Sequence, residues 1–177
     1  PDSHRKNFRE GNMTPLANGI NRLNDITGRL TGYLALPLIA VVVYEVFMRY
    51  VFNAPTSWGF EATTFIYGMH FILGIGYTYK HNGHVAIDIF ESRLPAKPRT
   101  ILRIIVGLVF FLPTIGLFAI YSTIYAIDSW KIWEHASTSW APPVYPFKTI
   151  MAIGFILLFL QGVAKLIEDF KSLGPNS

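Results

Sequence analysis

Long apolar runs alternate with short polar connections along this chain. The apolar runs occupy positions of about 33–52, 60–79, 101–127 and 147–166. A helix of about twenty residues crosses the roughly 30 Å hydrocarbon core of a bilayer. The pattern therefore predicts an all-α membrane protein with four transmembrane helices in a single domain, residues 16–170, followed by a polar tail at 171–177.

The residues before the first span show a different pattern. From Leu16 to Leu34 the apolar residues recur every three or four positions, and asparagine, aspartate and arginine fill many of the positions between them. This spacing predicts an N-terminal amphipathic helix that lies in the membrane interface, although an extension of the first span into water explains the same pattern. Residues 1–15 form a polar N-terminal segment outside this domain, and Met13 within it indicates an appended leader or an alternative start.

The second and third spans are not uniform. The second is interrupted by Glu61, His70 and several hydroxyl groups, which predicts that part of its surface faces protein and not lipid. The third is longer than the hydrocarbon thickness requires, so we expect it to tilt, protrude or kink near Pro113.

Lysine and arginine are concentrated on one side of the predicted topology. They are frequent before the first span, in the connection at 80–103 and after the fourth span, and they are scarce in the connections at 53–57 and 128–146. Because basic residues favour the cytoplasmic side, this bias predicts a multi-pass membrane protein with both termini in the cytoplasm, N-in and C-in.

Composition narrows the possible chemistry. The 177 residues are 51% hydrophobic and 15% charged and include no cysteine, which excludes disulfides, thiolate metal sites and cysteine-ligated iron–sulfur clusters. The formal charge of +4 is scattered between apolar runs, so no basic stripe predicts a nucleic-acid partner. No phosphate-binding loop or catalytic constellation occurs, and we expect no enzyme activity, no cofactor and no bound metal.

Charged residues inside predicted spans are candidate functional groups because burying a charge in lipid is costly. Glu45 and Arg49 are four residues apart on one helix face, and Glu61 lies across the short turn that follows. These three residues are a candidate structural clasp between the first two spans. A different hypothesis is a self-sufficient four-helix exporter that uses Glu45 as a proton or cation site, but the nearby cation of Arg49 would keep that carboxylate ionised.

His70 is the only histidine well inside a span. A haem-bearing membrane anchor would hold its cofactor between paired imidazoles on facing helices, so a single histidine argues against that hypothesis. A hydrogen bond between helices is the expected role.

The connection between the third and fourth spans is rich in tryptophan. Its aromatic residues match the belt that forms at a bilayer surface, and its charges give it the mixed polarity of a transient protein interface. We treat it as a candidate periplasmic docking surface made of Asp128, Trp130, Lys131, Trp133, Glu134 and Trp140.

Short motifs in a fixed order link the chain to a known family. They are Arg49-Tyr50-Val51-Phe52-Asn53, then Trp58 and Glu61, then Gly74-Ile75-Gly76-Tyr77, and then His84-Val85-Ala86-Ile87-Asp88 running on to Leu94-Pro95. With four spans around them, these motifs resemble the small membrane subunit of tripartite ATP-independent periplasmic (TRAP) transporters, the DctQ type.

The resemblance implies a location in the bacterial cytoplasmic (inner) membrane and a division of tasks among three proteins. In such transporters a soluble periplasmic substrate-binding protein (DctP-type) captures an organic anion, and a large membrane subunit (DctM-type) carries the substrate and sodium sites as an elevator. The small subunit braces the static scaffold of the large one. By this resemblance the partners are these two proteins and membrane lipids, and the candidate subunit interface is Trp58, His70, Gly74, His84 and Asp88.

Overall fold

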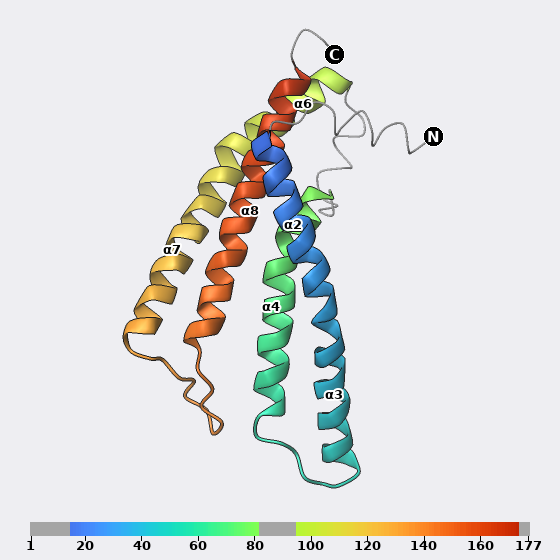
Figure 1. Cartoon of the computed structure of the whole chain (residues 1–177), viewed down its shortest axis with the longest axis vertical. Coiled ribbons are helices and arrows are strands. Elements are labelled where there is room, and N and C mark those ends of the chain that lie inside the picture. Colours follow the sequence, from blue (N-terminus) through green and yellow to red (C-terminus); the bar gives the residue numbers. More distant parts are fainter. Residues whose placement is uncertain (1–14, 82–94, 174–177) are drawn as a thin grey trace.

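The computed structural model describes residues 15–81 and 95–173, and its regular elements in these ranges are helices. They are α2 (Pro15–Tyr33), α3 (Ala35–Tyr50), α4 (Gly59–Lys80), α6 (Ala96–Val106), the π-helical segment η1 (Gly107–Phe111), α7 (Leu112–Lys131) and α8 (Tyr145–Ser172). The start of α2 and the end of α8 lie at one end of the molecule, and the connections at 51–58 and 132–144 lie at the other (Figure 1).

Helix α8 is at the centre of the packing. It lies against α7, α4 and α2, and smaller contacts join it to α6 and η1. Its buried positions include small residues that let neighbouring helices approach closely, among them Ala152, Gly154 and Ala164. Helix α3 differs, because it packs mainly on α4 and has no buried residue. Many of its apolar side chains, such as Leu36 and Ile39, are therefore exposed on the side away from α4.

Three helical stretches in the described part of the chain are long and apolar enough to cross a membrane. They are Pro15–Tyr50, Lys97–Lys131 and Tyr145–Ser172. Helix α4 is about 33 Å long by its 22 residues, but its polar groups keep it out of this set. The all-helical membrane architecture is therefore confirmed in coarse form. A membrane-spanning role for α4, the predicted second span, stays a prediction.

Helices α2 and α3 form one long rod with a local break at Leu34. Pro37 explains the break, because it has no N–H to donate and its ring disfavours a regular helical turn before it. The chain tightens there, and the Leu34 N–H bonds to the Thr31 carbonyl at 3.0 Å. The first helix therefore begins well before the predicted edge of the first span.

A second irregularity lies in the long third helix. The five residues of η1 adopt π-helical geometry immediately before Pro113, and the Leu112 N–H reaches back to the Gly107 carbonyl. Proline at 113 cannot donate to Val109 in the usual pattern, and a π turn is one way to accommodate that loss. The expected kink near Pro113 takes the form of this local change in helix type.

The polar side of α2 packs on protein. Asn21 and Asn24 are buried, whereas the apolar Leu16, Leu23 and Leu30 are exposed. An amphipathic helix in lipid can reverse the soluble pattern, because lipid solvates leucine while an amide needs a protein partner. The arginines of α2, Arg22 and Arg29, remain exposed. An interfacial position for this helix stays a prediction.

Close helix crossings depend on glycine. A Cβ added at Gly154 of α8 would lie 2.8 Å from the carbonyl oxygen of Ile72 in α4. That neighbour is backbone and cannot rotate away. At Gly76 of α4, an added Cβ would lie 2.4 Å from the side-chain oxygen of Asn24. These two glycines allow α4 to fit between α2 and α8.

We expect Gly154→Ala to destabilise the α4–α8 crossing by about 1–3 kcal/mol, the usual cost of overpacking. The matched control is Gly19→Ala, because a Cβ at Gly19 of α2 meets nothing within 4 Å. The control should be neutral or slightly stabilising, since alanine favours helix more than glycine does. Thermal unfolding of the purified protein in detergent compares the two, and equal melting temperatures would contradict the tight crossing.

Candidate functional site

A buried chain of amides joins α2 to α8. The Asn24 side chain, fully buried, donates from Nδ2 to Oε1 of Gln161 at 2.9 Å. Gln161 Nε2 donates to Oδ1 of Asn21 at 2.7 Å, and Asn21 Nδ2 donates to Oε1 of Glu168 at 3.0 Å. The side-chain oxygen of Asn24 is buried without a hydrogen-bond partner, and a Cβ added at Gly76 would lie 2.4 Å from it. Sequence reasoning missed this chain, and the available signal was one glutamine in an otherwise apolar helix.

The same end of α2 also binds the end of α4. Lys80 donates to Oδ2 of Asp25 at 2.6 Å and to the carbonyl oxygen of Asn21 at 3.2 Å. Both charged side chains are partly exposed, so the pair adds less to stability than the buried amides do. It fixes the position of α4 on α2.

The candidate clasp has different members from those expected. Arg49 donates to Oε1 of Glu45 at 2.8 Å, and the other carboxylate oxygen accepts from both the N–H and the hydroxyl of Thr56. Thr56 in turn accepts from the Gly59 N–H at 3.1 Å, at the start of α4. Within the described residues no hydrogen bond joins Arg49 to Glu61, and one oxygen of Glu61 is buried without a hydrogen-bond partner. Thr56 is therefore the link from α3 to the turn.

Two candidate subunit-interface residues, Trp58 and His70, lie in internal contacts. The Trp58 ring lies 5.8 Å from Tyr44 and 6.4 Å from Trp140, so it connects α3 to the 132–144 loop. The Nδ1 atom of His70 lies 2.8 Å from the carbonyl oxygen of Thr31, at the break between α2 and α3.

The remaining members of this candidate set fall elsewhere. Gly74 lies beside the same break, since a Cβ there would be 3.8 Å from the Thr31 hydroxyl. His84 and Asp88 lie outside the described residues.

The 132–144 loop is anchored to α8 by a charged pair. Lys148, almost fully buried, bonds to Glu134 and lies 3.6 Å above the centre of the Tyr125 ring. The Lys148 ammonium holds the pKa of Glu134 below its ordinary value. Glu134 is therefore an anchor for the loop as well as part of its surface.

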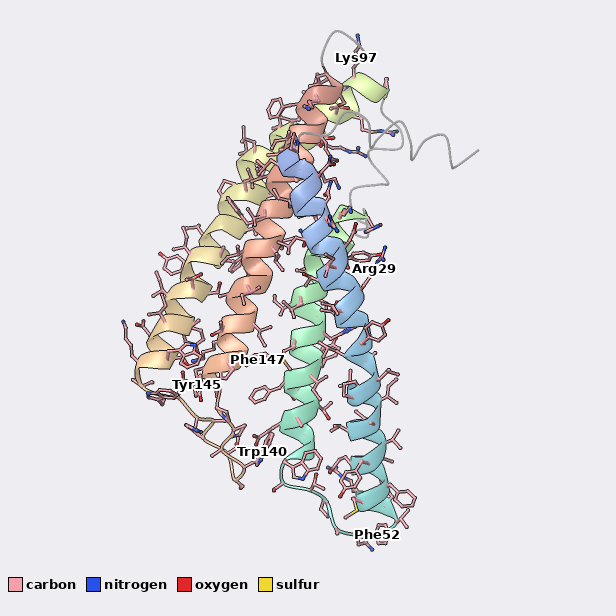
Figure 2. The ribbon with its side chains drawn as sticks, in the orientation of Figure 1. Arg29, Phe52, Lys97, Trp140, Tyr145 and Phe147 are labelled. Carbon is pink, nitrogen blue, oxygen red and sulfur yellow. The ribbon has the colours of Figure 1, made fainter. Side chains whose placement is uncertain are left out.

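Hydrogen bonds and aromatic rings fix the rest of this loop. Its two sides are joined by an Ala136 N–H bond to the Pro142 carbonyl at 3.0 Å. Trp130 donates to the Thr149 hydroxyl at 2.8 Å and lies against Tyr145. Figure 2 shows Trp140 near the loop end of α4, and Phe147, which stacks on Phe65 of that helix at 5.0 Å.

Two members of the candidate docking surface pair on the exposed end of α7. Lys131 donates to Oδ1 of Asp128 at 2.7 Å, with both side chains more than half exposed. Trp133 and Trp140 also have exposed surface. The candidate docking surface therefore divides into exposed groups and an anchored Glu134. In residues 15–81 and 95–173 no cluster of three histidine or acidic side chains is arranged to hold a metal ion.

Comparison with known families decides the classification. Residues 38–172 match the family model described as tripartite ATP-independent periplasmic transporters, DctQ component. The chain belongs to the DctQ family. The DctQ family is one component of TRAP transporters, and together with the long apolar helices of this chain it supports a multi-pass protein of the inner membrane.

Two curated DctQ-type proteins of Vibrio cholerae serotype O1 (strain ATCC 39315 / El Tor Inaba N16961) show the same relationship. The C4-dicarboxylate TRAP transporter small permease protein DctQ is 25% identical over 90 residues, 51% of this chain and 35% of that protein. The sialic acid TRAP transporter small permease protein SiaQ is 29% identical over 77 residues, 44% of this chain and 44% of that protein. The chain thus spans less than half the length of the curated relatives it matches.

We predict that acid releases the 132–144 loop. The folded-state pKa of Glu134 is depressed, so its pair with Lys148 stabilises the loop above the ordinary glutamate pKa and is lost as pH falls through the folded value. All four tryptophans lie at this end of the molecule, since Trp58 is 6.4 Å from Trp140, so tryptophan emission between pH 7 and pH 3 reports the change.

Matched variants identify the group that titrates. Glu134→Gln should remove the transition and give the acid-type emission at pH 7, while Asp128→Asn should keep the transition, because Asp128 lies in the separate exposed pair. A transition that survives Glu134→Gln would assign the titration to another group.

Proposed function

We propose that this chain is the small membrane subunit of a TRAP transporter and braces a large sodium-coupled elevator subunit during uptake of an organic anion. The observation that carries the proposal is the DctQ family match over residues 38–172. The relatives' names mention C4-dicarboxylate and sialic acid, which both carry carboxylates, and this supports an organic anion as the class of substrate. The partners are a DctM-type subunit and a DctP-type binding protein.

The packing of α3 supports a bracing role. No residue of this 16-residue helix is buried, and the exposed fractions of Leu36, Ile39 and Val43 are 67%, 59% and 60%. A helix of this kind offers one complete apolar face to a neighbouring helix or to lipid. Its other side is held on α4 through Glu45 and Thr56, so a partner on α3 would be fixed to the rest of the chain.

The contacts of Glu45 argue against transport by this chain alone. Both carboxylate oxygens are used, one by Arg49 and the other by Thr56. A proton or cation site in a membrane needs a carboxylate that can exchange its partner. The clasp is better suited to joining helices than to carrying substrate.

The positions of the first and last described helices, α2 and α8, support an orientation with both termini in the cytoplasm. Basic residues gather near the start of α2, the start of α6 and the end of α8, which lie at one end, and the tryptophan-rich loop lies at the other (Figure 1). Helix α4 runs between α3 and α8, so we propose that it crosses the membrane as the second span predicted at 60–79, shielded from lipid on its polar face.

Reconstitution tests the bracing role. We expect liposomes that contain this chain alone to show no sodium-driven uptake, and liposomes with the large subunit, the binding protein and this chain to be active. Omission of this chain should lower uptake at least tenfold. Flux through the chain alone, or full uptake without it, would contradict the proposal.

Docking of the binding protein is tested at the exposed end of α7. Lys131→Glu reverses a charge that is 68% exposed, so it should slow capture of the loaded binding protein, most strongly at low salt. The control is Lys97→Glu at the opposite end of the same helical stretch, which should not change capture. Transport rates measured over a range of binding-protein concentrations check this, and equal rates for both variants would remove the docking role.

A further inference from the structure

An open groove runs between α7 and α8 on the side of the 132–144 loop. Its volume is about 580 Å³, and its walls are almost entirely apolar. Tyr121, Ile124 and Tyr125 line it from α7, and Met151 and Phe155 line it from α8. Neither the clasp nor the amide chain contributes to its walls.

The two ends of this groove differ. The stacked rings of Phe118 and Phe155, 5.4 Å apart, lie at the end nearer the middle of the helices. Asp128 lies at the other end, ten residues further along α7, a distance of about 15 Å. The groove is therefore a long apolar channel that is open along its side and has a charged group at its outer end.

The charged end carries both signs. Asp128 is paired with Lys131 at 2.7 Å, and the exposed fractions of the two side chains are 59% and 68%. An exposed ion pair of this kind is weak, so Asp128 and Lys131 can separate and bind the two charges of a zwitterion from outside the protein. Trp130 and Tyr145 lie close together beside this end, at the position expected for an aromatic belt among head groups.

We propose that the groove binds one acyl chain of a phosphatidylethanolamine, whose ammonium group donates to Asp128 and whose phosphate accepts from Lys131. Charge complementarity favours this occupant. A primary ammonium can donate hydrogen bonds to a carboxylate, while the choline head group cannot donate and the phosphatidylglycerol head group has no cation. The apolar walls take up the acyl chain in the leaflet beside the 132–144 loop. This site is independent of the bracing role.

Native mass spectrometry of the full chain tests the proposal. The protein is stripped of lipid in detergent and titrated separately with palmitoyl-oleoyl phosphatidylethanolamine, phosphatidylcholine and phosphatidylglycerol. We expect phosphatidylethanolamine to bind most tightly, and Asp128→Asn to weaken its binding roughly fivefold, the effect of losing one exposed charged contact. Lys97→Gln, at the far end of the same helical stretch, is the matched charge control and should leave binding unchanged.

A second pair of variants tests the groove itself. Ile124→Trp places a large ring in the channel and should abolish binding of the acyl chain. Ile127→Trp is the control, because Ile127 is similarly exposed on α7 but does not line the groove. Circular dichroism and gel filtration confirm that both variants fold. Equal binding of the three lipids, no binding of any, or tight phosphatidylethanolamine binding by Ile124→Trp would each overturn the proposal.

Discussion

The buried amide chain from Asn24 through Gln161 to Asn21 is the constraint on which the rest of the fold depends. In lipid an unpaired amide has no water to bond to, so these groups must meet each other. Their pairing places the polar side of α2 against α8. That position brings Asp25 to Lys80 and brings the Thr31 carbonyl within reach of His70.

The opposite end of the molecule is held by different forces. There the pair α3–α4 and the pair α7–α8 diverge (Figure 1), and aromatic rings such as Trp58 and Trp140 connect them. The ion pair of Glu134 with Lys148 fixes the loop that carries Trp140. Ring contacts and a partly exposed ion pair are weaker constraints than a buried amide chain. Changes in pH or in partners should therefore affect this end first.

Much of the helical framework could be predicted from the sequence, because an apolar run of membrane length has few possible structures other than a transmembrane helix. The partners of individual polar residues could not. Periodicity identified Asn21 and Asn24 as one face of α2, but a pattern cannot tell whether such a face meets water, head groups or another helix. Likewise, the sequence offers both Thr56 and Glu61 as partners for the Glu45–Arg49 pair, and the path of the 51–58 turn brings Thr56 to Glu45.

The pairing of donors and acceptors in the amide chain limits how α2, α4 and α8 can move relative to one another. Asn24 Nδ2 donates both to Gln161 on α8 and to the Ile20 carbonyl on its own helix, and Gly76 leaves no space for α4 to shift toward Asn24. A slip of one helical turn would leave several amides unpaired in a region without water, at a cost of about 1–3 kcal/mol for each group. These three helices are therefore expected to move as one rigid body. The proposed bracing role requires such a rigid body, because a flexible small subunit could not hold the scaffold of the large subunit still while the elevator moves.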